Sequence, residues 1–435
     1  MSKLDDLINK LCPDGVAYNK LVSVANVLYG FPSNATLFND EKNGMPLIRI
    51  RDVLQGRTDT YTTEDISDDY LIKKDDLLVG MDGNFHVGKW KSEPGYLCQR
   101  VCKIYPNETE TVLNNYLYHL LKPIFKQIED SKLGGTVKHL SAKDFNNLEI
   151  PVPPLEIQCE IVRILDNFTE LTAELTAELT ARKKQYEYYR DSLLTFKTEI
   201  PRVKLEELFD FRNGLSKGKE FFGRGIPFIS FTDVFNHRFL HKADIKSLVE
   251  CTDDEKKKLH VGRGDVLFTR TSETAEDVGR SSVMLDDIGD CVFNGFSIRA
   301  TPKTSKLLPE YCAYCFDTFS FRSYVTKNCA FTTRASLTGE TISKYEIPLP
   351  PLEIQERIVN VLDNFDAICS DLKIGLPAEI EARKKQYEYY RDLLLRFEPV
   401  GTDFAHTHTH TRGNLTFPIC LWVCYGKIGG YCTKY

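Results

Sequence analysis

The chain has 435 residues, of which 42% are hydrophobic and 27% charged, a composition typical of a folded protein with two or three domains. We find no apolar run of membrane-spanning length and no signal sequence at the start, which predicts a cytoplasmic protein. The 13 scattered cysteines favour reduced thiols over a disulfide framework, and the net charge of −6 argues against a surface that binds nucleic acid all over.

Residues 1–150 are expected to form a first domain of mixed α/β (α+β) type. Short strand-like runs such as PLIRIRDV and DDLLVGM alternate with turn residues and with apolar segments that fit short helices. The turn-rich stretches VGMDGNFHVGKW and GGTVKHLSAKDF carry side chains of the kind that contact base edges and phosphates. An ordinary solvated turn is the alternative reading of each stretch.

Residues 151–198 are predicted to form a first helical spacer. The connector PVPPLEIQ cannot lie inside a helix because proline lacks an amide donor, and the helical pattern starts at Leu155. A helix over 155–196 would be about 60 Å long, so it needs a partner helix. Its TAEL units at 172–175 and 176–179 are read as a solvated spacer whose length matters. Its heptad register is carried by Leu165, Phe168, Leu175, Leu179, Tyr186, Tyr189, Leu193 and Phe196.

Residues 199–347 are expected to form a second α/β domain, with strand-like PFISFTDV and GDVLFTR and basic loops RNGLSKGKEFFGRG and FTRTSETAEDVGRSS. Cys312 and Cys315 have the spacing of a zinc-ligand pair, but no second pair lies at a suitable distance, so we expect no metal site.

Residues 348–398 are predicted to form a second helical region that pairs with the first as an antiparallel coiled coil between the two domains. Gly375 and Pro377 in KIGLPAEIE predict a break, with one helix ending and another starting there.

Three blocks recur in the same order in both halves of the chain. GMPLIRIRDV pairs with GIPFISFTDV, LEIPVPPLEIQ…LDNF with YEIPLPPLEIQ…LDNF, and ARKKQYEYYRD occurs twice. Near-identity confined to these segments suggests that they bind the same partner twice, although drift after a tandem duplication is the alternative. Aromatic residues beside Lys and Arg in both copies are the candidate partner contacts, with a wide bundle core as the alternative: Tyr186, Tyr188, Tyr189, Tyr387, Tyr389 and Tyr390.

Motifs for catalysis are missing from the sequence. GLSKGKE lacks the spacing of a nucleotide-binding loop, no dinucleotide fingerprint follows a strand, and the Asn-Pro-Pro-aromatic motif of amino-methyltransferases is absent. We therefore expect no catalytic residues, no metal and no cofactor in this chain.

The repeated blocks, together with NKLCPDGVAY near the start, resemble the DNA-specificity subunit of type I restriction-modification enzymes over residues 1 to about 398. The resemblance implies two target-recognition domains that read a bipartite, asymmetric site in double-stranded DNA. It also implies that paired helices dock two methyltransferase subunits, and that restriction subunits join through the complex. S-adenosylmethionine, ATP and Mg are then expected on the partner subunits.

Polar side chains in the turn-rich stretches are the predicted DNA contacts, since Arg can pair with guanine, Asn with adenine and Lys with phosphate. The first domain contributes Arg49, Arg51, Asn84, His86, Lys89, Lys138 and His139. The second domain contributes Lys217, Lys219, Arg224, Arg270, Thr271, Ser272, Arg280, Arg334 and Ser336.

Residues 399–435 form an atypical tail in which His406, His408 and His410 alternate with Thr, a pattern more typical of a flexible tail than of a metal site. Two other functions stay open. One is a structural coiled-coil scaffold with two protein-binding heads, and the other is a self-sufficient methyltransferase.

Overall fold

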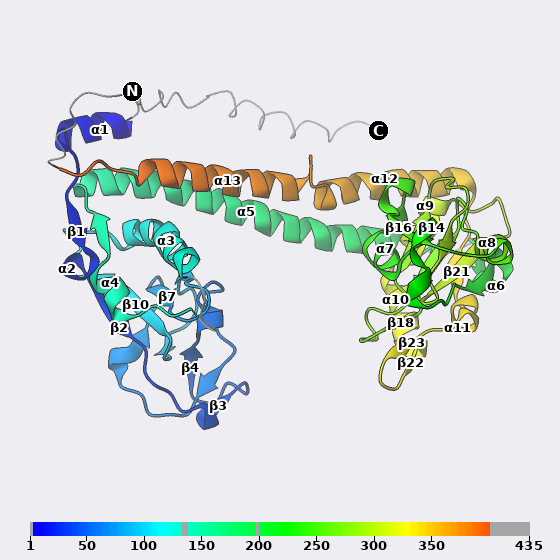
Figure 1. The fold of residues 1–435 in the computed structure, drawn as a ribbon, viewed down its shortest axis with the longest axis horizontal. Helices are drawn as coiled ribbons and strands as arrows, with labels where there is room; N and C mark the ends of the chain where they lie inside the picture. The colour runs from blue at the N-terminus through cyan, green and yellow to red at the C-terminus, as the bar shows by residue number, and fades with distance from the viewer. Residues whose placement is uncertain (1–2, 133–137, 197–199, 401–435) are drawn as a thin grey trace. The chain divides into compact units, whose positions relative to one another are not determined.

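The computed structural model describes residues 3–132, 138–196 and 200–400, which form two units of mixed helices and strands. The first unit contains Met1–Ala173 and Glu381–Tyr435, and the second contains Glu174–Ile380 (Figure 1). The expected fold class is two mixed α/β domains separated by two long helices that form an antiparallel coiled coil. The two sheet-rich domains and the long helix between them are confirmed. The division into units falls inside two helices. The domain boundaries expected at 150, 198, 347 and 398 stay predictions.

The head of the first unit, meaning the part outside the long helices, contains two larger sheets. One is antiparallel in the order β2-β10-β7-β8, and the other runs β3-β5-β4-β9-β6 with β4 and β9 parallel. The elements are α1 (Lys3–Leu11), β1 (Tyr18–Lys20), α2 (Leu21–Val24), β2 (Ala25–Tyr29), β3 (Phe38–Asn39), β4 (Met45–Ile48), β5 (Tyr61–Thr62), β6 (Leu71–Ile72), β7 (Leu77–Gly80), β8 (Val87–Lys89), β9 (Gly95–Leu97), β10 (Val101–Pro106), α3 (Asn114–Ser131), α4 (Ala142–Asn146) and β11 (Glu149–Pro151).

Helix α3 supplies the centre of the first unit's core. It buries Tyr116, Leu117, Leu120, Leu121 and Phe125, which lie on one helical face and pack with the inner face of the β2-β10-β7-β8 sheet. The start of the long helix α5 joins the same core, so the head and the helix fold as one body.

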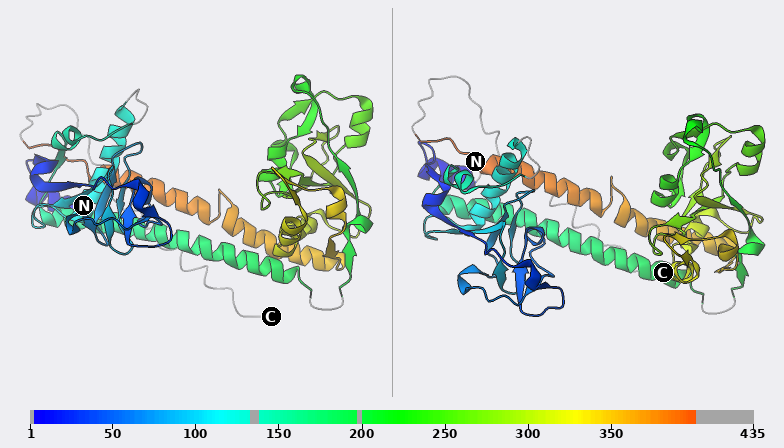
Figure 2. Two further views of the ribbon diagram at one scale, coloured as in Figure 1. Left: turned by 90° about the horizontal axis from the view of Figure 1, so that it is seen from below. Right: turned by 60° about the horizontal axis from the view of Figure 1, so that its bottom comes forward.

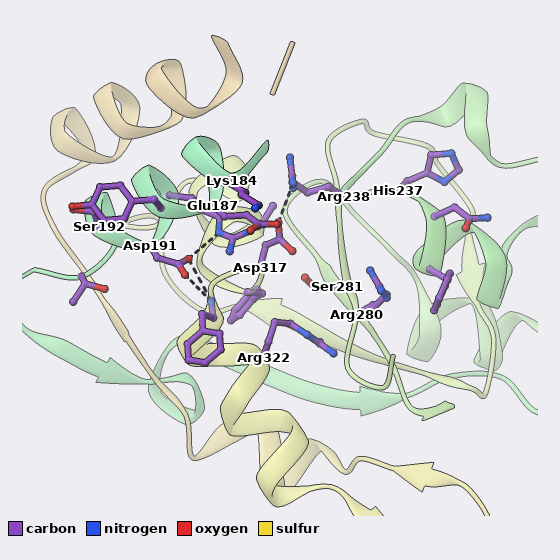
Figure 3. A pocket seen from close by; sticks show the side chains of 18 residues that line it. Lys184, Glu187, Asp191, Ser192, His237, Arg238, Arg280, Ser281, Asp317 and Arg322 are labelled. Atoms are coloured by element: carbon purple, nitrogen blue, oxygen red, sulfur yellow. Dashed lines mark hydrogen bonds and ion pairs between the residues drawn. The ribbon is translucent and has the colours of Figure 1, made fainter. Parts of the chain in front are cut away.

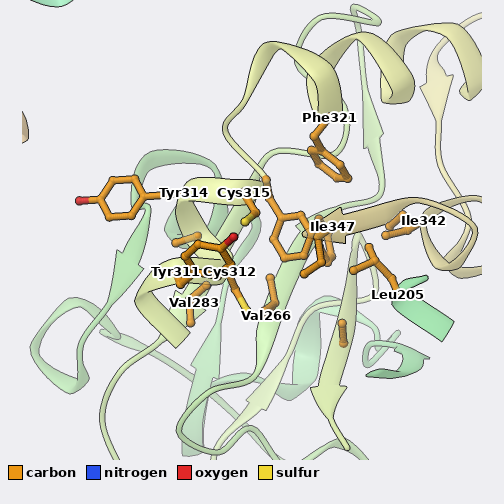
Figure 4. Packing of buried hydrophobic residues seen from close by; sticks show 14 of the residues in the cluster. Leu205, Val266, Val283, Tyr311, Cys312, Tyr314, Cys315, Phe321, Ile342 and Ile347 are labelled. Carbon is orange, nitrogen blue, oxygen red and sulfur yellow. The ribbon is translucent and has the colours of Figure 1, made fainter. Parts of the chain in front are cut away.

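The second unit repeats this plan with a five-stranded sheet in the order β13-β21-β17-β19-β15. Its core includes Tyr311, Tyr314 and Phe321 beside Val266 and Val283 (Figure 4). Its elements are β12 (Arg202–Lys204), α6 (Leu205–Leu208), β13 (Phe209–Asn213), β14 (Phe222–Ile229), α7 (Phe231–Asn236), β15 (Phe239–Leu240), β16 (Ser247–Val249), α8 (Asp253–Leu259), β17 (Val266–Thr269), β18 (Thr271–Ser272), β19 (Ser281–Met284), β20 (Val292–Phe293), β21 (Ser297–Pro302), α9 (Pro309–Cys315), α10 (Phe319–Asn328), β22 (Ala330–Phe331), β23 (Ala335–Ser336), α11 (Gly339–Ser343) and β24 (Glu346–Pro348).

The repeated strands GMPLIRIRDV and GIPFISFTDV are shorter than their sequences suggest. In both copies an aspartate ends the strand by accepting a hydrogen bond from the backbone amide three residues earlier. Asp52 accepts from Arg49 at 2.9 Å, and Asp233 accepts from Ser230 at 2.8 Å. The strand reading of the last residues is therefore wrong, because this capping starts a short helix.

The helical regions agree with the predicted pattern. Helix α5 (Leu155–Leu193) is continuous, whereas the second copy forms α12 (Leu352–Ser370) and α13 (Leu376–Leu394). Gly375 occupies the predicted break, where a Cβ would lie 2.6 Å from the Ala367 carbonyl oxygen, and Pro377 lies in the first turn of α13.

Each unit pairs one copy of LDNF with the other copy of ARKKQYEYYRD. In the first unit the ring of Phe168 stacks on Tyr390 at 5.3 Å, and in the second Tyr189 stacks on Phe365 at 5.5 Å. In both units the paired helical segments run in opposite directions (Figures 1 and 2). Each LDNF segment therefore packs against the ARKKQYEYYRD segment of the other repeat.

Buried glutamines attach each head to its helix in the same way. Gln158 accepts a hydrogen bond from the Leu113 amide at 2.9 Å and donates to the Pro153 carbonyl at 2.7 Å. Gln355 does the same with the Leu308 amide at 2.9 Å and the Pro350 carbonyl at 2.8 Å. The LEIQ motif thus provides the residue that fixes a head on a helix.

Candidate nucleic-acid interface

Three chain segments meet at one place in each unit, which we call the three-segment junction. In the first unit the Met81 amide donates to the Arg100 carbonyl at 2.8 Å, and the Leu140 amide donates to the Met81 carbonyl at 2.8 Å. In the second unit the Arg270 amide donates to the Phe296 carbonyl at 2.7 Å, and the Leu337 amide donates to the Arg270 carbonyl at 2.9 Å. The backbone pattern is the same, so the two junctions are equivalent.

The junction of the first unit is polar. Asp82 forms an ion pair with Arg100 at 3.0 Å and lies within hydrogen-bond distance of His139. The Lys138 ammonium donates to the Glu129 carbonyl oxygen at 2.6 Å, and the turn leaves Asn84 exposed. The junction therefore brings the predicted residues Asn84, Lys138 and His139 together and adds Arg100.

The other predicted DNA contacts of the first unit have neighbours within that unit. The Arg49 guanidinium lies 5.7 Å from the ring centre of Phe38, and Lys89 lies 4.5 Å from that of Tyr118. Arg51 donates to Thr60 Oγ1 at 2.7 Å. His86 is half-buried, and its carbonyl accepts from the Gly80 amide at 2.9 Å.

The junction of the second unit borders an apolar pocket of about 530 Å³. Four predicted residues line it, namely Lys217, Arg270, Thr271 and Ser336, and the Thr271 and Ser336 strands pair directly. Phenylalanines form much of the wall: Phe222, Phe228, Phe231 and Phe296.

The predicted cations of the second unit differ in which groups neutralise them. The Lys217 ammonium binds Glu255 at 2.7 Å and is nearly buried. Among the described residues no carboxylate forms an ion pair with Arg270, Lys219 or Arg334. Arg270 is therefore available to an external anion without breaking an internal pair.

Two further predicted cations lie in exposed ion pairs. Arg224 binds both oxygens of Glu250 at 2.7 and 3.1 Å, and Arg280 binds Asp277 at 2.9 Å. Because exposed ion pairs are screened by water and contribute little to stability, an external anion can replace the carboxylate at little cost. Ser272 lies half-buried in β18.

Sequence reasoning missed the side chains at the tip of each junction, Arg100 and Phe296. Each stands three positions after the buried last residue of the preceding strand, Leu97 in β9 and Phe293 in β20. Aligning the two halves on these strands would have identified the equivalent positions, which differ fully in chemistry.

The six predicted partner-binding tyrosines fall into three environments. Tyr188 and Tyr389 occupy matching positions and are 69% and 65% exposed. Tyr189 and Tyr390 stack on phenylalanines, as described above. Tyr186 is buried in the core of the second unit, so its assignment to a surface contact is wrong and the core reading holds for it.

Tyr387 and Tyr186 occupy equivalent inner positions with different neighbours. The Tyr387 hydroxyl lies 2.9 Å from His119 Nδ1, and His119 Nε2 lies 2.8 Å from Asp166. Burial lowers the pKa of His119, although hydrogen bonding to Asp166 opposes that effect. In the second unit Tyr314 replaces the histidine and donates to Asp363.

An ion-pair network joins α5 to the head of the second unit around a pocket of about 980 Å³ (Figure 3). Asp317 binds Arg190 of the ARKKQYEYYRD segment at 3.1 Å and Arg238 at 2.9 Å. Arg322 donates to the carbonyl oxygens of Gly279 and Val278, both at 2.8 Å. Because Asp317 pairs with both Arg190 and Arg238, the network orients the head on the helix.

The cysteine pair is part of the core. Cys312 and Cys315 lie buried in α9, and burial raises the pKa of Cys315 to about 12, which keeps the thiol protonated (Figure 4). Within the described residues no group of three or more His, Cys, Asp or Glu is arranged to hold a metal ion. His406, His408 and His410 lie outside the described residues.

The family model described as Type I restriction modification DNA specificity domain matches the chain twice, over residues 13–182 and 199–382. The specificity subunit of the type I restriction enzyme EcoBI from Escherichia coli is 27% identical over 382 residues, covering 81% of this chain and 79% of that protein. The EcoR124I/EcoR124II specificity subunit of Escherichia coli is 34% identical over 313 residues, covering 67% and 72%.

One solved structure, from a study of complex assembly and conformational transition of the type I restriction-modification system, has the same fold. Its TM-score is 0.60 at 17% identity, and the match covers 88% of this chain and 98% of that chain. In the part of the chain that the structure describes, no helix is both long and apolar enough to cross a membrane.

Proposed function

Because the chain belongs to the type I restriction-modification DNA specificity family, we propose that its two three-segment junctions each read one half of a bipartite, asymmetric DNA target. One observation carries this proposal. Two equivalent backbone junctions present unlike side chains, Arg100 in one unit and Phe296 in the other. Because the two backbones are equivalent and their exposed side chains differ, the two junctions are expected to read different half-sites.

The chemistry of the junctions supports DNA as the ligand. Donors gather at both, from Lys138, His139 and Arg100 in the first unit and from Arg270 and Thr271 in the second. Hydrogen bonds from such groups to phosphates fix register, while Asn84, exposed in the first junction, is of the residue type that pairs with adenine.

Partner binding is the second part of the proposal. Tyr188 and Tyr389 are exposed aromatic residues at matching positions of identical segments, so one partner surface can bind both. We infer that two methyltransferase subunits bind there and that restriction subunits join through the resulting complex. S-adenosylmethionine, ATP and Mg then belong to those partners, and this chain supplies recognition without catalysis.

Methylation mapping tests the proposal. The full chain is co-expressed with its methyltransferase subunit, and methylated adenines are located across the host genome. A single motif with two defined halves and an unread spacer is expected. Random methylation, or a contiguous motif, would contradict two-part reading.

The scaffold alternative is separated by DNA binding of the assembled complex. Specific binding should weaken steeply with salt because phosphate contacts release counterions. A complex that assembles but binds specific and scrambled duplexes equally would favour a protein-binding scaffold. Binding of S-adenosylmethionine by the lone chain, measured by calorimetry, would instead favour a self-sufficient methyltransferase.

A further inference from the structure

The turn at 294–297 in the second unit holds its backbone firmly. Asn294 is buried, its Nδ2 donates to the Ile229 carbonyl at 3.1 Å and to Ser297 Oγ at 3.0 Å, and its Oδ1 accepts from the Phe296 amide at 2.9 Å. The Phe296 carbonyl accepts from the Arg270 amide at 2.7 Å. The backbone amide and the backbone carbonyl of Phe296 are therefore both held by hydrogen bonds.

The side chain on this fixed backbone faces solvent. Phe296 is 62% exposed, and it has no stacking or edge contact with another described ring. The turn is also closely packed from behind, since a Cβ on Gly295 would lie 2.4 Å from Ser216 Oγ. Because the backbone that carries this exposed apolar ring is already held, a ligand that covers the ring restricts only the side chain.

The surroundings of Phe296 indicate which ligand covers it. Arg270, without an internal ion pair, and the hydroxyls of Thr271 and Ser336 line the same pocket. The phenylalanines of this pocket offer an apolar surface, and the unpaired cation beside hydroxyl donors adds groups that bind phosphate, a combination that matches a base stack flanked by phosphates. Rigid apolar side chains can enter such a stack between two base pairs.

We propose that Phe296 is a wedge that inserts between two base pairs of the half-site read by the second unit, while Arg270 binds an adjacent phosphate. This inference rests on the proposed function. The first unit presents Arg100 at the equivalent position, so it reads its half-site without a wedge. Only one half of the target is then unstacked and kinked.

Fluorescence of 2-aminopurine tests the wedge in the assembled complex of the full chain with its methyltransferase subunit. The base analogue replaces one adenine at a time in a duplex carrying the mapped target. Apart from any change at the adenine that is methylated, we expect the wild-type complex to increase the 2-aminopurine fluorescence at one base step, which lies in only one half-site. Phe296→Ala should abolish that signal and weaken specific binding about tenfold, whereas Phe296→Leu, still apolar and bulky, should keep part of both.

Phe319→Ala is the matched control, since Phe319 is another exposed phenylalanine of the second unit, 74% exposed, and lies outside the pocket at the junction. It should leave the signal in the Phe296 half-site unchanged. The wedge is overturned if no step brightens in the wild-type complex, if Phe296→Ala keeps the signal, or if Phe296→Ala instead prevents methyltransferase binding. If the wild-type complex does not bind its target specifically, the proposed function itself is contradicted. That outcome differs from specific binding without a fluorescence signal, which contradicts only the wedge.

Discussion

His119 lies beside Tyr387 in the first unit, and Tyr314 takes the equivalent place in the second unit. Burial lowers the pKa of His119 in the folded chain, while an unfolded histidine titrates near 6.5. Below about pH 6.5 the unfolded chain therefore binds more protons, and stability falls as the pH drops toward the folded-state pKa.

Thermal unfolding between pH 7.5 and pH 5.5 checks this expectation. The wild-type chain should lose stability across the range, whereas His119→Tyr, which copies Tyr314 and can still donate to Asp166, should lose less. An identical pH dependence for both would show that the buried imidazole does not control it.

Tyr188 and Tyr389 allow the two partner sites to be separated at the residue scale. Truncating an exposed hot-spot aromatic residue typically costs about 2 kcal/mol or more of binding free energy. Each single alanine variant should bind one methyltransferase subunit, and the double variant none, as measured by native mass spectrometry. Tyr105, an exposed tyrosine outside the repeated segments, provides the control, and full assembly of the double variant would refute the assignment.

Helix α5 is the element that belongs to both units, and its two TAEL units lie where the division between units falls. Deleting residues 176–179 shortens the helix by about 6 Å. At about 3.4 Å per base pair, the unread spacer of the target should shrink by about one or two base pairs. Methylation mapping of the deletion variant measures the spacer, and an unchanged spacer would mean that helix length does not set it.

At the scale of the whole molecule, the exchange of repeated segments predicts what half a chain does. Residues 1–198 contain the first head, one LDNF and one ARKKQYEYYRD, but the ARKKQYEYYRD copy that packs on that head lies at 382–392. Two half-chains can supply it to each other, since the two copies are identical. The fragment should therefore form a homodimer, seen by sedimentation, and with methyltransferase should methylate a symmetric target. A folded monomer would show that the exchange is not required.

The sequence by itself determined the duplication, the long helix, its break at Gly375 and the mixed α/β heads, because these depend on local periodicity and on glycine and proline geometry. Only the tertiary structure decided that each LDNF segment pairs with the ARKKQYEYYRD segment of the other repeat, that Tyr186 is core, and that Arg100 and Phe296 form the junction tips. Those features depend on contacts between residues far apart in the chain, where identical segments have identical local preferences and only packing distinguishes their partners.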